Sequence, residues 1–285
     1  MTNLFQIADI KLQFDYNFPD FFKDRISSYE KADIIPDYFM KVTIESFIER
    51  PKGISKLVYK DRFLFEDGNT CYLFKEDETK SITDLIRYDK DFKHIDIILS
   101  DKIGSRLPEV EYLLTGMMFF EIALENSRIS IHASAISYND EAILFSAPSQ
   151  TGKSTQAELW TSNLEGVKII NDDKPVLFLK DNELWTSGTP WSGKTPRNEN
   201  ISNRVKCIVF LEQSSKDELL SLSNQEIITY FLRNIHRPKE EHRLIKILKT
   251  IETLVYQTPV YLYKTTKDQS SFEYLYYAIY RGDHL

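Results

Sequence analysis

A segment of small and polar residues follows an apolar run near the middle of the chain. It reads Ala-Pro-Ser-Gln-Thr-Gly-Lys-Ser-Thr from Ala147 to Thr155, which matches the phosphate-binding pattern GxxxxGK[ST] except that alanine replaces the first glycine. In such loops, backbone N–H groups and a helix N-terminus converge on phosphate oxygens, the lysine adds a positive charge, and the next hydroxyl ligates Mg²⁺. A helix start with a surface lysine is the simpler alternative. The residues expected to bind a nucleotide are Ser149, Gln150, Thr151, Gly152, Lys153, Ser154 and Thr155.

Two adjacent acids end the next apolar run. Val167 to Ile170 is followed by an asparagine and then by Asp172 and Asp173. If this strand lies beside the strand that precedes the loop, both carboxylates reach the edge of the sheet where ligands of open α/β sheets bind. One carboxylate would then hold Mg²⁺, and the other would accept a proton from a substrate hydroxyl. A solvent-exposed Asp-Asp turn is the alternative.

A histidine lies on the run that leads into the loop. Between Ile131 and Ser137, strand alternation places His132 and Ser134 on the same face. The pair Asn139-Asp140 is typical of a tight turn, so this run is expected to form a hairpin with the strand that precedes the loop. We therefore expect His132 to lie near the phosphate site, although an isolated histidine is more often a hydrogen-bonded core residue.

Two basic residues, Lys194 and Arg197, follow the sequence Trp191-Ser-Gly. Cationic side chains at this place would suit a clamp on a γ-phosphate or on an acidic substrate. A mobile basic loop without such a role is an equal alternative.

Two regions with different periodicity must position these residues. From Ile7 to about Lys102 the pattern has the period of β-strands, and Asp67-Gly68-Asn69 predicts a hairpin turn. Leu107 to Asn126 has helical spacing, and strands then alternate with helices, which is typical of an α/β fold with a mixed sheet. We therefore expect a strand-rich region over residues 1–106, suited to substrate recognition, and a P-loop domain with a helical C-terminal segment over residues 107–285.

Composition excludes several classes of protein. The 285 residues are 42% hydrophobic and 28% charged, as in folded globular proteins. A net charge of −7 gives no broad basic surface for nucleic acid or an anionic membrane. The two cysteines form no zinc or disulfide pattern, and no apolar stretch suits a signal peptide or a membrane span. We expect a cytoplasmic protein that binds neither nucleic acid nor membrane, with its oligomeric state left open.

Taken together, the motifs resemble the catalytic core of HPr kinase/phosphorylase and its bacterial kinase relatives. The P-loop domain of that family is also similar to that of phosphoenolpyruvate carboxykinase, although the present chain is much shorter than those enzymes. The resemblance extends from about His132 to Gln213 and includes Thr189-Pro-Trp-Ser-Gly193, which is similar to a segment of short, uncharacterised family members.

The resemblance implies a role for each matching residue. Lys153 and Ser154 would engage the phosphates of ATP and the Mg²⁺ ion. Asp172 and Asp173 would serve as metal ligand and catalytic base, and His132 would lie near the transferred phosphate.

The resemblance also implies a function. Family loops usually have glycine where Ala147 and Gln150 stand, and these side chains restrict the backbone, so nucleotide affinity could be reduced. The expected activity is Mg²⁺- and ATP-dependent phosphoryl transfer to a hydroxyl, that of a serine in a protein or in a peptide such as a ribosomally made precursor. A kinase for a small molecule such as free serine, and a regulatory module that binds nucleotide without catalysis, are the alternatives. GTP or pyrophosphate could replace ATP as donor.

Overall fold

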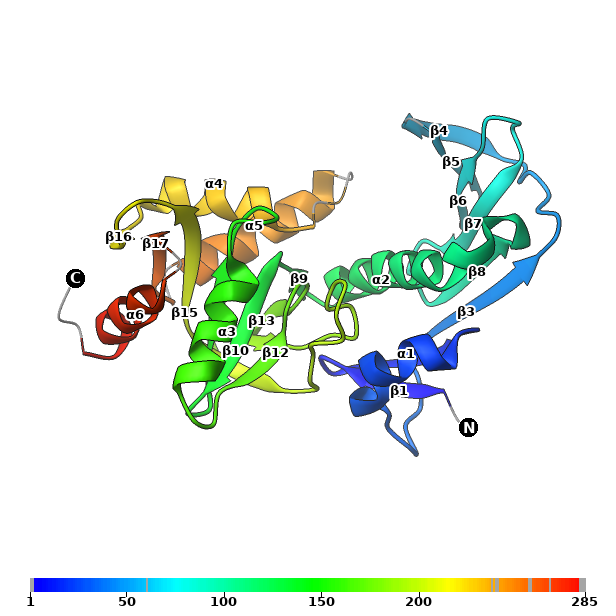
Figure 1. Cartoon of the computed structure of the whole chain (residues 1–285). Helices are drawn as coiled ribbons and strands as arrows, with labels where there is room; N and C mark the ends of the chain where they lie inside the picture. The colour runs from blue at the N-terminus through cyan, green and yellow to red at the C-terminus, as the bar shows by residue number, and fades with distance from the viewer. Residues whose placement is uncertain are drawn as a thin grey trace. The chain divides into compact units, whose positions relative to one another are not determined.

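The structure is a computed structural model that describes residues 3–59, 61–236, 238, 241–255, 258–266 and 268–281. It divides into two compact units, Met1–Asn126 and Ser127–Leu285 (Figure 1). Within the described residues there are two mixed sheets and six α-helices. The chain is therefore an α/β protein, as its sequence predicts.

The first unit is built on an eight-stranded sheet with the order β1-β2-β3-β8-β7-β6-β5-β4. β3 runs parallel to both of its neighbours, β2 and β8, while the other pairs are antiparallel. The predicted hairpin turn at Gly68 is confirmed, because it joins β5 to β6 with a φ of +60° at the glycine. The strands are β1 (Leu4–Ile7), β2 (Ile10–Asp15), β3 (Tyr38–Glu45), β4 (Ile54–Tyr59), β5 (Arg62–Asp67), β6 (Thr70–Glu76), β7 (Ile82–Asp89) and β8 (His94–Ser100).

Two α-helices belong to this unit, α1 (Pro19–Ile26) and α2 (Leu107–Glu125). α2 lies against β8 (Figure 1), and its buried Glu111 accepts hydrogen bonds from the backbone N–H and the side chain of Asn17, at 2.8 and 3.3 Å. The guanidinium of Arg25 in α1 stacks on the ring of Tyr112 at 4.5 Å. The sequence analysis placed the domain boundary before α2, at residue 107. In the structure the contacts of α2 assign it to the first unit, which ends at Asn126.

The second unit is built on a nine-stranded sheet. Its main path is β12-β10-β11-β15-β14-β13-β9, and β17 pairs with β15 and with β16. The strands are β9 (Ile129–Ser130), β10 (Ala133–Tyr138), β11 (Glu141–Ser146), β12 (Lys168–Asn171), β13 (Val176–Lys180), β14 (Glu183–Ser187), β15 (Ser202–Gln213), β16 (Glu218–Ser221) and β17 (Val260–Thr265). The helices are α3 (Lys153–Asn163), α4 (Asn224–Asn234), α5 (Glu241–Val255) and α6 (Gln269–Arg281).

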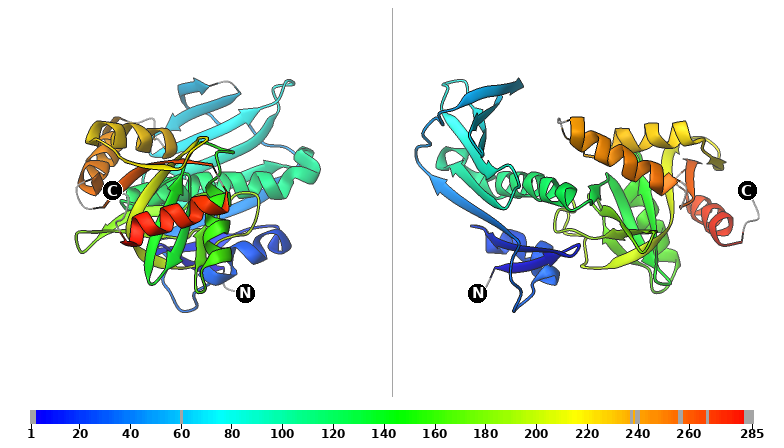
Figure 2. Two further views of the ribbon diagram at one scale, coloured as in Figure 1. Left: turned by 60° about the vertical axis from the view of Figure 1, so that its left-hand side comes forward. Right: turned by 180° about the vertical axis from the view of Figure 1, so that it is seen from behind.

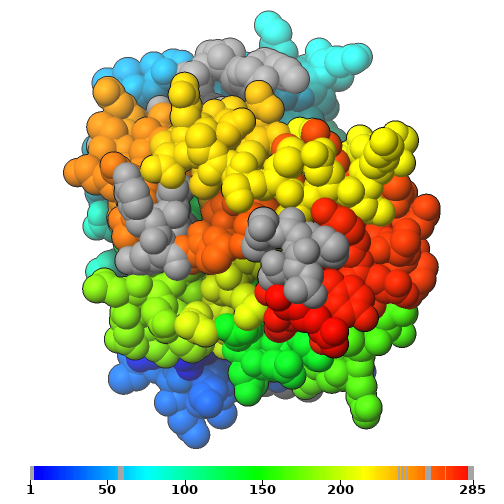
Figure 3. Space-filling model, turned by 90° about the vertical axis from the view of Figure 1, so that its left-hand side faces the viewer, coloured from blue at the N-terminus to red at the C-terminus, as the bar shows by residue number. Residues whose placement is uncertain are grey.

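Parallel pairing of β11, β15 and β17 forms the centre of this sheet. α3 and α6 cover one face, where Phe145 and Val209 join Trp160 and Phe272 in one hydrophobic core (Figure 2). α4 covers the other face, because the ring of Phe210, the next residue after Val209, packs on α4 and is fully buried there. α5 packs on α4, and α4 and α6 are both seen on the surface in Figure 3.

The predicted hairpin into the loop is also confirmed. Asn139 and Asp140 join β10 to β11 with φ values of +51° and +60°, as a two-residue turn between twisted strands requires. None of the helices among the described residues is both long and apolar enough to cross a membrane.

Candidate active site

The predicted phosphate-binding segment forms the loop between β11 and α3. Gly152 adopts a φ of +118° immediately before α3 begins at Lys153. Gln150 adopts a φ of +66°, a left-handed conformation that costs a residue with a β-carbon about 1–2 kcal/mol. Ala147 is only 2% exposed and joins the core cluster of Phe145. The loop therefore tolerates alanine at 147 by burying its methyl group, whereas at 150 it retains strain that glycine would relieve.

The other predicted loop residues differ in exposure. Ser149, Gln150 and Thr155 are exposed, while Thr151 and Ser154 are partly buried. The Gln150 carbonyl accepts a hydrogen bond from Gln213 of β15 at 3.3 Å, which ties the loop to the end of the central strand.

Lys153 is the most buried of these polar residues, with an exposed fraction of 7%. Its Nζ lies 2.9 Å from His132 Nε2 and donates to the carbonyls of Ala147 at 3.0 Å and Pro148 at 3.2 Å. Burial lowers the pKa of Lys153, although the negative charge of Asp173 opposes this effect. The ammonium group is therefore held inside the loop, where a phosphate would have to compete with two carbonyl oxygens for it.

His132 connects this lysine to the acid pair. Its Nδ1 lies 2.8 Å from Asp173 Oδ1, although the angle does not satisfy a hydrogen bond. The backbone of the histidine is fixed on the other side, since its N–H donates to the Asn234 carbonyl at 2.6 Å. If Lys153 is charged, Nε2 must act as the acceptor and Nδ1 must carry the proton.

The two acids have different surroundings. Burial would raise the pKa of Asp173, but the contact with His132 and the charges of Lys174 and Lys153 outweigh burial, so its pKa is lowered. Asp172 Oδ1 accepts a short hydrogen bond of 2.6 Å from the hydroxyl of Ser134. Among the described residues, no partner reaches Asp172 Oδ2, which leaves one carboxylate oxygen available for a ligand.

Asn171, which the sequence analysis did not single out, fixes the turn that carries Asp173. Its Oδ1 accepts from the backbone N–H groups of Asp173 at 2.9 Å and Lys174 at 2.6 Å, and its Nδ2 donates to the Thr189 carbonyl at 2.8 Å. The side chain is fully buried. An asparagine that ends a strand before two acids is a recognisable turn former, so the signal was present in the sequence.

The sequence predicts that the strand carrying the two acids lies beside the strand that precedes the loop, and this prediction is wrong. The acids follow β12, which pairs with β10 and not with the loop strand β11. The tight hairpin places β10 directly beside β11, and β15 occupies the other side of β11, so β12 can only add at the free edge of β10. His132 precedes β10 and therefore lies between the lysine and the acids.

The segment after β14 approaches the acids closely. A β-carbon added at Gly193 would lie 3.1 Å from Asp173 Cβ, and this glycine has a φ of +84°. Both the short distance to Asp173 and the left-handed backbone therefore disfavour any residue with a side chain at position 193. Gly193 ends the motif Thr189-Pro-Trp-Ser-Gly193, but the sequence does not predict that it contacts Asp173.

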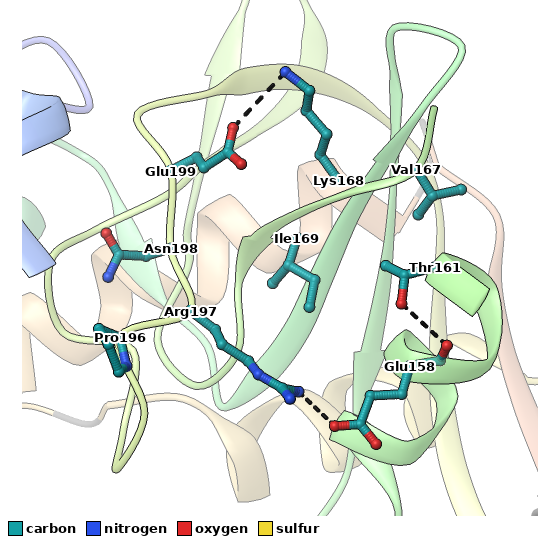
Figure 4. A pocket seen from close by; sticks show the side chains of 9 residues that line it. All are labelled: Glu158, Thr161, Val167, Lys168, Ile169, Pro196, Arg197, Asn198 and Glu199. Carbon is teal, nitrogen blue, oxygen red and sulfur yellow. Dashed lines mark hydrogen bonds and ion pairs between the residues drawn. The ribbon is translucent and has the colours of Figure 1, made fainter. Parts of the chain in front are cut away.

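The two candidate clamp residues lie on this same segment. The Arg197 guanidinium pairs with Glu158 of α3 at 2.5 Å, and this contact raises its pKa. The pair crosses a cavity of about 450 Å³ bordered by α3, β12 and residues 196–199 (Figure 4). Arg197 contacts the acid pair through its backbone, because its carbonyl accepts from the N–H of Asp172 at 3.1 Å. Lys194 is exposed. The structure thus brings together Lys153, His132, Asp172 and Asp173, and directs the side chain of Arg197 to α3.

Comparisons with known proteins add little to this geometry. No protein-family model matches the chain, and no curated protein sequence matches it. A solved structure of the Hpr(Ser) kinase/phosphatase from Coxiella burnetii matches 45% of this chain and 93% of its own, with 20% sequence identity and a TM-score of 0.26. A similarity of this size carries no conclusion about function.

Proposed function

We propose that the second unit binds a nucleoside triphosphate with Mg²⁺ and transfers its γ-phosphoryl group to the hydroxyl of an acceptor, a serine in a protein or peptide. The proposal rests on one observation. Lys153 of the loop contacts His132 at 2.9 Å, and His132 contacts Asp173 at 2.8 Å. A cationic phosphate cradle and an ionised carboxylate therefore share one small site, which phosphoryl transfer requires.

Each side chain has a distinct task in this reaction. The loop N–H groups and Lys153 would hold the phosphates, with the lysine leaving its carbonyl partners to do so. Asp173 would accept the proton of the acceptor hydroxyl as its oxygen forms the new bond to phosphorus and the bond to the nucleoside diphosphate breaks. His132 holds Asp173 beside Lys153 and would keep the base in position.

A magnesium ion would bind at this site through oxygen atoms of two side chains. Within the described residues no group of three or more His, Cys, Asp or Glu side chains could hold a metal alone. Mg²⁺ commonly binds through one or two protein oxygens together with phosphates and water. Ser154 and Asp172 would hold it here, and its charge would neutralise the phosphate oxygens.

A second candidate is nucleotide binding without transfer. The left-handed Gln150 and the carbonyl contacts of Lys153 both oppose tight phosphate binding. A protein of this kind would bind Mg²⁺ and ATP without labelling any acceptor. A kinase for free serine or a similar metabolite differs from the main proposal only in its acceptor.

The test is transfer of radiolabelled γ-phosphate from ATP with Mg²⁺ to a serine-peptide library and to free serine. Lys153→Ala and Asp172→Asn should each reduce transfer at least about 100-fold, because each removes charge used in the transition state. Lys168→Ala, which removes an exposed lysine of β12, is the matched control and should leave transfer unchanged. Retained transfer in Lys153→Ala or Asp172→Asn would refute the mechanism, and ATP binding with no labelled acceptor would favour the second candidate.

A further inference from the structure

The first unit contains a small cavity with an unusual lining. Its volume is about 220 Å³, and it lies where β3 and β8 end and β7 begins. Three basic side chains and three serines line it, together with apolar residues, and no acidic residue of the described chain borders it. The polar lining consists of Ser46, Arg50, Lys80, Ser81, Ser100 and Lys102.

The three cations come from separate parts of the chain. Arg50 follows β3, Lys80 lies in the turn between β6 and β7, and Lys102 follows β8. Acids outside the cavity lining offset part of this charge, because Glu76 pairs with Arg50 and the charge of Lys102 helps to lower the pKa of Asp77. The remaining positive charge favours an anion in the cavity. Neither Lys80 nor Lys102 pairs with a carboxylate within the described part of the chain.

Arg50 is held in place by contacts outside the cavity. Its guanidinium pairs with Glu76 and lies 5.4 Å from the centre of the Phe74 ring and 5.6 Å from that of Phe63. Such stacking orients the planar group and reduces the entropy lost when its remaining N–H groups bind a ligand.

Lys80 is held in a strained conformation. Its φ is +63°, and a left-handed conformation costs a lysine about 1–2 kcal/mol. The turn is fixed by Asp77, whose Oδ1 accepts from the N–H groups of Thr79 at 2.8 Å and Ser81 at 3.0 Å. A strained backbone persists only where its surroundings fix it, so these hydrogen bonds hold Lys80 at the border of the cavity.

We propose that this cavity is a binding site for a phosphomonoester dianion. Because Arg50 is paired with Glu76, Lys80 and Lys102 supply two positive charges, which match a dianion better than they match one carboxylate. The remaining N–H groups of Arg50 and three serine hydroxyls add further donors for the phosphate oxygens. Phe47, which is 76% exposed, lies at the border of the cavity. An apolar side chain beside the cations favours a phosphorylated residue within a peptide over a free phosphate ion.

This proposal does not depend on the activity of the second unit. If that activity is also correct, the phosphopeptide that it produces has the chemistry that the first unit binds. Each statement can fail without the other.

The test is calorimetric titration of the full chain with four ligands: a phosphoserine peptide with leucine on both sides of the phosphoserine, its unphosphorylated twin, its glutamate twin, and inorganic phosphate. The double variant Lys80→Asn/Lys102→Gln removes two charges, and asparagine tolerates the left-handed φ at position 80. Affinity for the phosphopeptide should fall at least about tenfold, as expected for the loss of charge-assisted hydrogen bonds. Lys31→Gln, an exposed lysine of the same unit outside the cavity, and Lys153→Ala should both bind the phosphopeptide as the wild type does.

The four ligands also identify the source of the phosphate. Stronger binding of the phosphopeptide than of inorganic phosphate supports a peptide ligand, and equal binding supports a free phosphate. Equal binding of the three peptides, or no loss in the double variant, would overturn the proposal.

A second measurement uses the wild-type chain and does not depend on how the variants fold. Bound phosphopeptide should protect Lys80 and Lys102, but not Lys31, from an amine-reactive reagent, as read by mass spectrometry. Equal labelling of all three lysines with and without the peptide would also overturn the assignment.

Discussion

The left-handed backbone at Gln150 makes the phosphate loop less stable than a glycine there would. Replacing Gln150 by glycine should stabilise the second unit by about 0.5–1 kcal/mol, since the strain relieved exceeds the entropy that glycine adds to the unfolded chain. Gln150→Ala is the matched control, because it removes the same side chain and retains a β-carbon. Urea unfolding measures both, and equal stability of the two variants would show that φ at this position is not the cause.

Burial alone would raise the pKa of Asp173, but its neighbours lower it, and His132 has the largest effect among them. The acid is therefore ionised in the folded protein down to a lower pH than its ordinary 3.8. This contributes stability that is present above the unfolded pKa and lost as the pH falls through the folded one. His132→Asn should move the titration of the Asp173 carboxyl upward, as measured by NMR. His94→Asn removes a similar histidine contact, with Asp89 in the first unit, and should leave Asp173 unchanged.

The sequence predicts candidate residues for the site, but it does not predict the contacts among them. Lys153, Asp172 and Asp173 could be found because a loop motif and a strand that ends in acids are local patterns. The contact of Gly193 with Asp173 and the pairing of Arg197 with Glu158 join residues that are distant in sequence. No periodicity or spacing predicts such contacts, because they depend on the path of the chain between the strands.

At the scale of the element, α3 must be held rigidly for Lys153 to stay in its place. Trp160 anchors this helix: it is fully buried, and its ring lies 5.5 Å from that of Phe272 in α6. Trp160→Ala should cost about 3–5 kcal/mol, and Trp160→Phe less, because no described residue satisfies the indole N–H. Trp185, on β14 and partly exposed, provides the control, as its replacement by alanine should cost less. Equal losses at the two positions would contradict the role of Trp160 as the anchor.

Most helices and strands could be predicted because each has a local signal. The helical spacing from Leu107 to Asn126 and the turn pair Asn139-Asp140 predict α2 and the hairpin of β10 and β11. Strand order is a different problem, since β12 carries nothing that distinguishes the edge of β10 from that of β11. The sequence also does not predict to which unit α2 belongs. Its contacts with Asn17 and Arg25 join residues that lie far apart in the sequence.

At the scale of the whole molecule, the two units have separate sheets and separate proposed ligands, so each ligand should stabilise its own unit. A ligand that binds only the folded state at 100 times its Kd adds about 2.7 kcal/mol of stability. We expect calorimetry of the full chain to show two unfolding transitions, with ATP and Mg²⁺ raising one and the phosphoserine peptide raising the other. Lys153→Ala should abolish only the first shift, and Lys80→Asn/Lys102→Gln only the second. A single transition that either ligand raises as a whole would mean that the units unfold together, and that binding in one stabilises both.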